Sequence, residues 1–590
     1  MFVLHKNHLA ALFALLLFAL CPVRADDKPA AGDPDEAIRD LFTHKKLFLK
    51  TEYKTLRKAF TRRFELLHQD AIRQAYGSDY DVMTAWLDAN PDIKEEFYTA
   101  IDEKHNSIEA ALRLFKDIYK QYPDKLKPYA ELAIATAVTW DEPRKGVYDY
   151  RQHQVRVHSS LPGEGLGGLD NFKYIVDNER IMEGRGQHLP WEFLVHVVNH
   201  KTPLAERKWA VKQYLANRRM IGRCYHQVPY DHGMLRDEAS AKLAGHEYTL
   251  PNIRSYGGVC AMQADFAARV GKSLGVPAEY VWGEGNSLGL HAWVMWVELK
   301  QVAKGKILGS LESHGRYDID KFYTGNLRDP QTGEVILDRD MELRLSTVVY
   351  DKQAKRHADL IMRAFPALRD HLDMKGNAQL AYLQGCMDVC PYNQECWLTV
   401  AALSRDHVVK PSQASRMVSY VDKLIRTFRL FPDFTWKVLE DLLTIDQDAT
   451  HRARLYERLV ALYERAQRPD LACQARLKLA DYQSDGKEYK KAAKGLAFTI
   501  EKFPSEGRYI PKLMDKLEET CQQFKDGNKL LMQFYLRFLP TIPAKRGDEP
   551  SKYCIAMHEK AIAFFKTANK DQVVANLERR LELVKAGAIR

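Results

Sequence analysis

The spacing of apolar residues predicts helices over most of the chain. From about Glu36 to Trp140, apolar side chains recur every three or four positions, as in "SIEAALRLFKDIYKQYP", which is typical of amphipathic helices. The proline of Tyr122-Pro123 ends one of these helices, and another is expected from Pro128 to Val138. Two helices joined by so short a turn would form one hairpin of the kind that builds helical repeats.

Between about 256 and 345 the period changes to that of strands. A helix that begins at Cys260 is followed by four short runs rich in β-forming residues, namely "AEYVWG", "LHAWVMWVEL", "KILGSLES" and "EVILD". A helix followed by antiparallel strands predicts an α+β domain.

From Lys352 to Arg590 the helical period returns. Several small and aromatic residues lie where a tetratricopeptide-type hairpin places its packing residues: Ala480, Tyr482, Gly486, Tyr489, Ala492, Leu496, Ile500 and Phe503-Pro504. An irregular helical bundle is the alternative interpretation of the same pattern.

The N-terminus has a different character. Residues 1–25 carry Lys6, an apolar run from Leu9 to Leu20 and a small-x-small pattern at Val23-Arg24-Ala25, which together predict a cleaved secretory signal. We therefore expect an exported protein, periplasmic or secreted, with no membrane span after cleavage. The expected organisation is a signal peptide at 1–25, a polar linker at 26–35, a helical region at 36–150, an α+β core with its preceding helices at 151–350, and a helical, tetratricopeptide-like region at 351–590.

Composition is that of an ordinary soluble protein, with 46% apolar and 28% charged residues in 590. The net charge of +10 would fall to +8 when Lys6 and Arg24 leave with the signal. Because the basic residues alternate with acidic ones along the chain, we expect no nucleic-acid partner. No phosphate loop or dinucleotide motif is present, and we expect no cofactor.

Metal-ligand patterns are weak. Three cysteines, 386, 390 and 396, cluster, and two of them could pair in a disulfide; without a fixed histidine partner they are a weak signal for a zinc site. His196 and His200 have helical spacing, yet the glutamate of the zinc-protease motif is missing. Cys224, His226 and His232 could gather around a metal, but loop histidines near a tight turn are usually hydrogen-bonded residues. The acidic segment around Asp318 and Asp320 lacks the glycine and the terminal glutamate of an EF-hand, so we expect no metal.

Cys260 is the candidate nucleophile. Gly257 and Gly258 allow a tight turn before it, and Gly275 with Pro277 ends the helix that it begins. At a helix N-terminus the free backbone N–H groups and the dipole favour a thiolate and could also bind an oxyanion, so we expect a lowered pKa. The alternative is a small residue packed at a tight junction.

His291 is the candidate base. Alternation along "LHAWVMWVEL" places His291, Trp293, Met295 and Val297 on one face, which we expect to pack against the Cys260 helix. A histidine at the start of that strand would then reach the helix N-terminus. Cysteine with histidine is the minimal pair for thiol catalysis.

The segment "YGGVCAMQADFAARVGKSLGVPAEYVWGEG" followed by "HAWVMWVEL" resembles the core of the transglutaminase-like superfamily. The resemblance covers roughly 90 residues and implies a papain-like arrangement, with Cys260 as nucleophile, His291 as base and an acidic residue on the next strand. That strand, "KILGSLESHGRYD", has no aspartate before Asp318, so the expected orienting residue is Glu312, with Ser313 and His314 as alternatives.

Two functions stay open. The first is acyl transfer or peptide and amide hydrolysis through a Cys260 thioester, as in a cysteine peptidase, an amidase or a transglutaminase-like acyltransferase, with a protein or peptide substrate. The second is an inactive module in a scaffold whose helical repeats bind a partner protein.

Overall fold

The computed structural model describes residues 32–142, 145–163, 165–285, 290–316, 323–410, 412, 414–446, 448–546 and 549–589. The predicted signal peptide and most of the predicted linker lie outside these residues. Tertiary contacts divide the chain into two compact units. We call them the sheet unit, built from residues up to 283, 290–316 and 324–400, and the helical unit, built chiefly from residues beyond 400.

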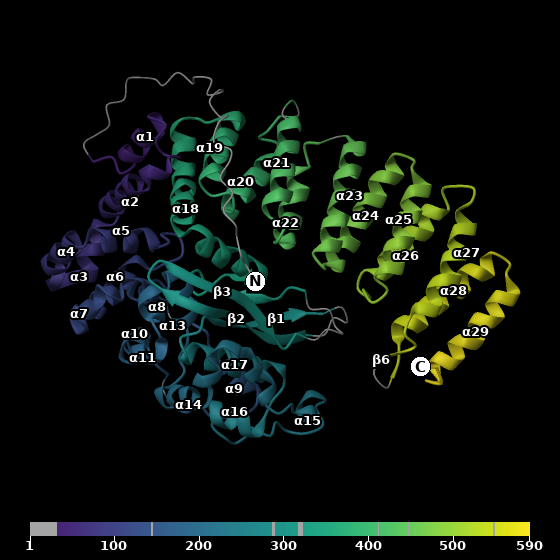
Figure 1. The fold of residues 1–590 in the computed structure, drawn as a ribbon, viewed down its shortest axis with the longest axis horizontal. Coiled ribbons are helices and arrows are strands. Elements are labelled where there is room, and N and C mark those ends of the chain that lie inside the picture. The colour runs from purple at the N-terminus through teal and green to yellow at the C-terminus, as the bar shows by residue number, and fades with distance from the viewer. Residues whose placement is uncertain are drawn as a thin grey trace. The chain divides into compact units, whose positions relative to one another are not determined.

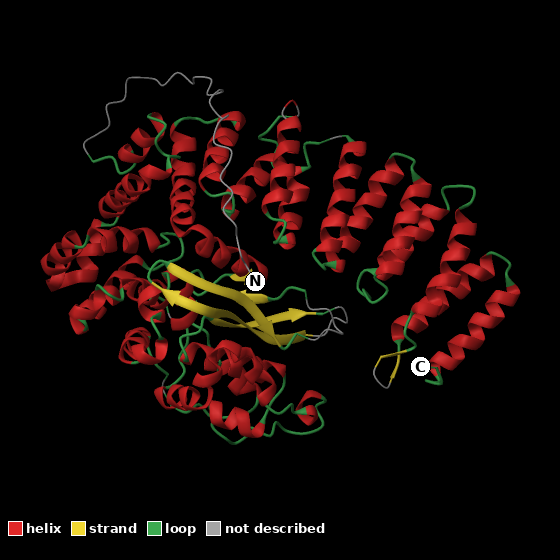
Figure 2. Ribbon diagram, viewed as in Figure 1, coloured by secondary structure: helices red, strands yellow, loops and turns green. Residues whose placement is uncertain are grey.

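The sheet unit contains one five-stranded sheet of antiparallel strands among many helices, so the expected α+β class is confirmed (Figure 2). The strands are β1 Ala278–Glu284, β2 Leu290–Ala303, β3 Lys306–His314, β4 Asn326–Arg328 and β5 Val335–Leu337, in the order β3-β2-β1-β4-β5. Four of them coincide with the predicted runs. The three residues of β4 are too short a segment to show a two-residue period.

Strands β2 and β3 form a long hairpin. Its register pairs Val294 with His314 at one end and Ala303 with Lys306 at the other, with an irregularity between Leu299 and Gln301. The turn contains Gly305, whose φ of +72° is readily adopted only by glycine. The hairpin therefore turns directly after Ala303.

Helix α17, Cys260–Ser273, packs on one face of this sheet (Figure 1). Met262 and Phe266 belong to the same buried cluster as Val294 and Trp296 of β2. Small residues on α17 let the helix approach the sheet closely, and every residue from Ala261 to Ser273 is buried.

The remaining helices of the sheet unit surround the sheet and α17. Before α17 they are α1 Glu36–Thr43, α2 Tyr53–Leu67, α3 Gln69–Tyr76, α4 Tyr80–Ala89, α5 Pro91–Ala100, α6 Ile108–Gln121, α7 Pro123–Leu126, α8 Ala130–Trp140, α9 Arg151–Arg156, α10 Gly168–Asp177, α11 Glu179–Met182, α12 Arg185–His188, α13 Trp191–Val198, α14 Leu204–Tyr214, α15 His232–Leu235 and α16 Leu250–Tyr256. Short 3₁₀ segments are η1 Lys50–Glu52, η2 Gly77–Asp79 and η3 Leu215–Gln227. After the sheet come α18 Asp338–His371, α19 Gly376–Val389 and α20 Gln394–Arg405. The hairpin expected between residues 111 and 138 is present as α6 and α8.

The helical unit is a succession of antiparallel helices, seen in green to yellow in Figure 1. They are α21 Ala414–Thr427, α22 Pro432–Leu442, α23 Ala449–Arg465, α24 Pro469–Asp485, α25 Tyr489–Lys502, α26 Ile510–Cys521, α27 Gly527–Phe538, α28 Lys552–Thr567 and α29 Asp571–Lys585, with η5 Leu539–Thr541 and the two-residue strands β6 Lys545–Arg546 and β7 Glu549–Pro550. Of the residues expected to pack as one hairpin, those from 480 to 502 lie on α24, on α25 and on the turn between them, and Phe503-Pro504 directly follows α25. Among the residues that the structure describes, none of the helices has the length and apolar character needed to cross a membrane.

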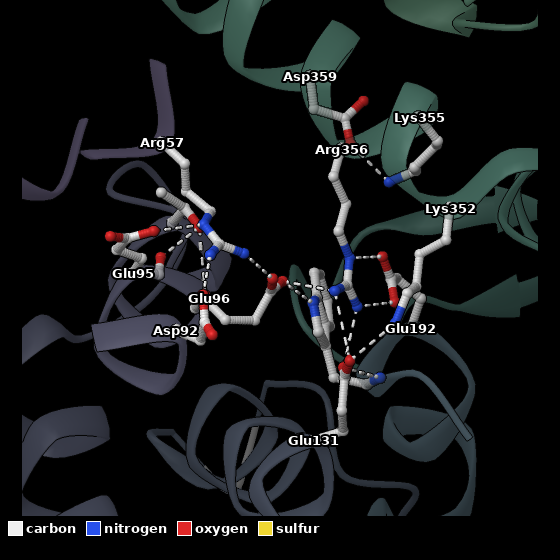
Figure 3. A network of polar contacts seen from close by, with 12 residues as sticks. Arg57, Asp92, Glu95, Glu96, Glu131, Glu192, Lys352, Lys355, Arg356 and Asp359 are labelled. Atoms are coloured by element: carbon white, nitrogen blue, oxygen red, sulfur yellow. Dashed lines mark hydrogen bonds and ion pairs between the residues drawn. The ribbon is translucent and has the colours of Figure 1, made fainter. Parts of the chain in front are cut away.

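A buried polar network joins the N-terminal helices to α18 (Figure 3). Arg356 of α18 makes two hydrogen bonds to Glu192 of α13, at 2.9 and 2.8 Å, and contacts Glu131 of α8 at 2.9 Å. Its guanidinium also lies 2.8 Å from Glu96 of α5. One cation therefore compensates carboxylates from three helices that are far apart in the sequence.

The turn after β4 predicts a pH dependence of stability. The Asp329 carboxylate accepts hydrogen bonds from the amides of Gln331 and Thr332 and pairs with Arg344. Burial raises the pKa of Asp329, but Arg344 and the Thr332 amide outweigh burial and hold this pKa at about 2, below the ordinary 3.8. A lowered pKa contributes stability above the unfolded value, and that contribution is lost as the pH falls.

We therefore expect the free energy of unfolding to fall by about 2 kcal/mol as the pH is lowered from 5 to 2, because Asp329 is protonated over this range. Urea unfolding followed by circular dichroism at several pH values measures this loss. In Asp329→Asn the loss over the same range should be smaller by about that amount, because the amide does not titrate. Equal losses in the two proteins would contradict the expectation.

Candidate functional site

Cys260 begins α17, as the sequence predicts. Gly257 has a φ of +86°, and a Cβ there would lie 2.2 Å from the carbonyl oxygen of Pro229. The Gly258 amide donates to that same oxygen at 3.0 Å, and the Asp231 amide donates to the Gly258 carbonyl at 3.0 Å. The glycines thus allow two chain segments to approach closely just before the cysteine.

The Cys260 thiol is partly accessible. Of the cysteines that the structure describes, Cys260 is partly exposed and the other seven are buried, and all eight are free thiols. Burial raises the pKa of the Cys260 thiol, and the backbone amides of Ala292 and then Ala261 oppose that rise without cancelling it. The expectation of a lowered pKa was therefore wrong in direction, because partial desolvation of the thiol outweighs the helix N-terminus. The resting side chain is a neutral thiol held among backbone donors.

His291 lies on β2 directly before Ala292, the residue whose amide approaches the Cys260 thiol. The imidazole is buried, with 5% of its surface exposed, and its Nε2 lies 2.5 Å from the carbonyl oxygen of Gly315. A carbonyl can only accept, so we assign the proton to Nε2. This tautomer leaves Nδ1 with the lone pair that a general base needs.

The face of β2 that packs against α17 is not the expected one. Ala292, Val294 and Trp296 belong to the buried cluster of α17, whereas the buried residues Trp293, Met295 and Val297 do not. The two-residue period shows which side chains share a face, but both faces of β2 are buried here. Burial alone therefore could not tell which face meets the helix.

The group that contacts Nε2 of His291 is not one of the three side chains that were expected to orient this histidine. Glu312 is paired with Trp296, five residues along β2 from His291, and its carboxylate accepts from Ser310 Oγ at 2.7 Å. Ser313 is paired with Met295 and His314 with Val294, and the His314 ring lies 4.8 Å from that of His226. The structure thus brings the backbone amide that follows His291 to the Cys260 thiol but does not bring Glu312 to His291.

The Gly315 carbonyl could not have been found by searching for side-chain chemistry. Gly315 has a φ of +94°, and a Cβ at this position would lie 2.6 Å from the ring of Tyr225. The Tyr225 hydroxyl in turn donates to the Ala292 carbonyl at 2.8 Å. The detectable signal is the glycine itself, which permits a backbone conformation that directs its carbonyl at the histidine.

Asp265, on α17, is a second group that sequence reasoning missed. It is completely buried and accepts hydrogen bonds from the hydroxyls of Tyr148, at 2.8 Å, and Tyr248, at 3.0 Å. Arg269, four residues on, lies 3.4 Å from Asp265 and 2.6 Å from Glu206 of α14. A charged pair at helical spacing within a helix of small residues was the available signal. This network anchors α17 and therefore the position of Cys260.

A second cysteine–histidine pair lies in the helical unit but lacks access. Cys554 Sγ is 3.6 Å from His558 Nδ1 on α28, and the two residues are 1% and 0% exposed. The same Nδ1 is 2.8 Å from the carbonyl of Cys554, to which it donates. This nitrogen cannot then accept a proton, so the pair serves as a control rather than a second site.

The residues considered as metal ligands have separate partners. His196 Nδ1 lies 2.7 Å from Glu279, and His200 Nδ1 lies 3.0 Å from Thr202 Oγ1. Within the described parts of the chain, no group of three or more histidine, cysteine, aspartate or glutamate residues could hold a metal ion. The acidic segment at Asp318 lies outside those parts.

Comparison of the chain with protein families, with curated proteins and with solved structures finds no match in any of the three. Any functional conclusion therefore depends on the chemistry of the site.

Proposed function

We propose that this is an exported, transglutaminase-like protein that carries out thiol-dependent acyl transfer or peptide and amide hydrolysis, with Cys260 as nucleophile and His291 as base. One observation carries the proposal. The Cys260 thiol, at the start of α17, is approached by the backbone amide of Ala292, the residue that follows His291. A partly exposed thiol, backbone donors and a buried imidazole whose Nδ1 can accept a proton are the parts that thiol acyl transfer requires.

The reaction proceeds by general-base assistance, because the resting thiol is neutral. As Sγ attacks the substrate carbonyl, Nδ1 of His291 takes the thiol proton. The backbone amides that surround the thiol stabilise the oxyanion, and the imidazolium returns its proton to the leaving amine. Water or a second amine then attacks the thioester, so the acceptor decides between hydrolysis and transamidation. We favour hydrolysis of a peptide or protein substrate.

The helical unit supports a second candidate function. Its successive antiparallel helices, such as α23 to α26, form hairpins of the kind that bind partner proteins in repeat arrays. A catalytically weak module beside such an array would serve as a protein-binding scaffold. Glu312, placed away from His291, favours this alternative.

Covalent trapping tests the proposal. On mixing with p-nitrophenyl acetate, the mature protein should release about one equivalent of p-nitrophenol in a burst. The thiol gains the acetyl group and the phenolate leaves with the thiol proton. Mass spectrometry of peptides should place the acetyl group on Cys260, since the other seven described cysteines are buried.

The burst should vanish in Cys260→Ser and slow by about 100-fold in His291→Ala. Cys554→Ser is the matched control, because it removes a buried cysteine that also lies beside a histidine, and it should leave the burst unchanged. Acetylation spread over several cysteines, or an unchanged burst in His291→Ala, would refute the enzymatic proposal and favour the scaffold.

A further inference from the structure

The end of β3 places a backbone carbonyl, rather than a side chain, at Nε2 of His291. This arrangement has a geometric requirement. The chain leaves β3 through Gly315 with a φ of +94°, and the Tyr225 ring leaves no room for a Cβ there. The residue that follows Gly315 is therefore the first that can influence the direction of this carbonyl.

Among the described residues, Asp338 and Trp293 both hold the next residue, Arg316. Its guanidinium pairs with the carboxylate of Asp338, the first residue of α18, whose side chain is completely buried. The same carboxylate accepts the amide of Gly325 at 3.1 Å, so it is fixed to the chain just before β4 as well. Burial lowers the pKa of Arg316, and Asp338 opposes that shift.

The second of these contacts is with an aromatic face. The Arg316 guanidinium lies 4.8 Å from the centre of the Trp293 ring, in the geometry of a cation–π contact. Trp293 is fully buried on β2, and its ring is the one that lies 6.0 Å from the His291 ring. Arg316 therefore packs on the tryptophan that lies next to the histidine, while its backbone continues from the carbonyl that the histidine contacts.

We propose that Arg316 is a positioning residue for His291: clamped between Asp338 and Trp293, it fixes the Gly315 carbonyl at Nε2 and thereby keeps Nδ1 as the basic nitrogen. The proposal rests on the function proposed above, since it concerns the base of that site. The clamp joins β3 to α18 and to β2, so it couples the orientation of the imidazole to the packing of the sheet unit.

Substitutions at both members of the ion pair test the clamp. Arg316→Met keeps much of the apolar stem but loses the charge and the planar group. Arg316→Lys keeps the charge without the flat guanidinium, and Asp338→Asn removes the counter-charge. Arg344→Met is the matched control, because it also removes an arginine paired with a buried aspartate, Asp329, in the same unit.

Two readouts separate positioning from general stability. Nitrogen chemical shifts of histidine rings labelled with ¹⁵N report the tautomer of His291, whose signals are identified by their loss in His291→Ala. We expect the Nε2–H tautomer in the parent protein and in Arg344→Met, and a mixture of tautomers in Arg316→Met and Asp338→Asn. The acetylation burst should slow by about 10- to 100-fold in Arg316→Met, with partial recovery in Arg316→Lys and an unchanged KM.

The outcomes are distinguishable. An Nε2–H tautomer that persists in both Arg316→Met and Asp338→Asn would overturn the clamp, even if Cys260 and His291 prove essential for acetylation. A burst that slows equally in Arg344→Met would overturn it too, because the effect would then be one of stability. If the burst does not depend on His291 while the tautomer changes with Arg316, the proposed function fails and the clamp stands as a structural device only.

Discussion

Replacing Arg356 by methionine is expected to lower the free energy of unfolding by about 3–5 kcal/mol, the range for breaking a buried ion pair by removal of one partner. The guanidinium lies among Glu96, Glu131 and Glu192, as Figure 3 shows, and two of its hydrogen bonds go to Glu192 alone. Methionine would leave these carboxylates buried with Lys352 as a remaining cation beside Glu131.

Protonation of these carboxylates makes the loss of stability in Arg356→Met depend on pH. Burial raises the pKa of Glu131, but Arg356 and Lys352 outweigh burial and bring it to about 2. Burial also raises the pKa of Glu96, and Arg356 opposes that rise. Without Arg356 the carboxylates take up protons more readily, so the deficit of the variant should shrink as the pH falls towards 5.

Urea unfolding at pH 7 and pH 5 measures these changes. Adding Glu192→Gln to Arg356→Met removes one stranded charge and should recover part of the loss. Arg113→Met is the control, because Arg113 forms an exposed pair with Glu109 on α6 and should change stability by less than about 0.5 kcal/mol. A loss below about 1 kcal/mol in Arg356→Met would mean that the network contributes little.

The elements that position the nucleophile could be predicted because local chemistry fixes them. Gly257 and Gly258 before Cys260, and Gly275 after the helix, mark both ends of α17, and Gly275 has the φ of +68° that ends it.

The contacts that complete the site could not be predicted, because they depend on long-range packing. Both faces of β2 are buried, so the pattern of apolar residues could not show which face packs against α17. The atom at Nε2 of His291 belongs to the main chain of Gly315, and a main-chain carbonyl is present at every position of a sequence. The search for a carboxylate therefore led to Glu312, which the register of the hairpin pairs with Trp296, five residues from His291.

The same limit applies to the networks that support the site. Arg356 meets carboxylates of α5, α8 and α13, which are separated from it by more than 150 residues of sequence. No spacing rule connects such positions. Asp265 and Arg269, a charged pair at helical spacing in α17, were a signal available in the sequence, but such a pair does not reveal its partners on other elements.

Replacing Cys260 by alanine should reduce kcat/KM for a peptide p-nitrophenyl ester by at least about 1,000-fold, because no other group at the site can form the thioester. His291→Ala should cost about 100- to 10,000-fold, the span of general acid–base catalysis. Because burial raises the pKa of the Cys260 thiol, His291→Ala should also show a rate that rises with pH above neutrality, as the unassisted thiol ionises.

The fate of the acyl group then decides the reaction class. In the presence of a primary alkylamine, chromatography of the products separates the free acid, made by hydrolysis, from the amide, made by transamidation. Because we favour hydrolysis, we expect more free acid than amide as long as water outcompetes the amine for the thioester. Both products should disappear in Cys260→Ala. Product formation that survives in Cys260→Ala at more than a tenth of the parent rate would exclude the thioester. Since Cys554→Ser removes the buried cysteine beside His558, normal kinetics in that variant would confine the chemistry to the thiol at the start of α17.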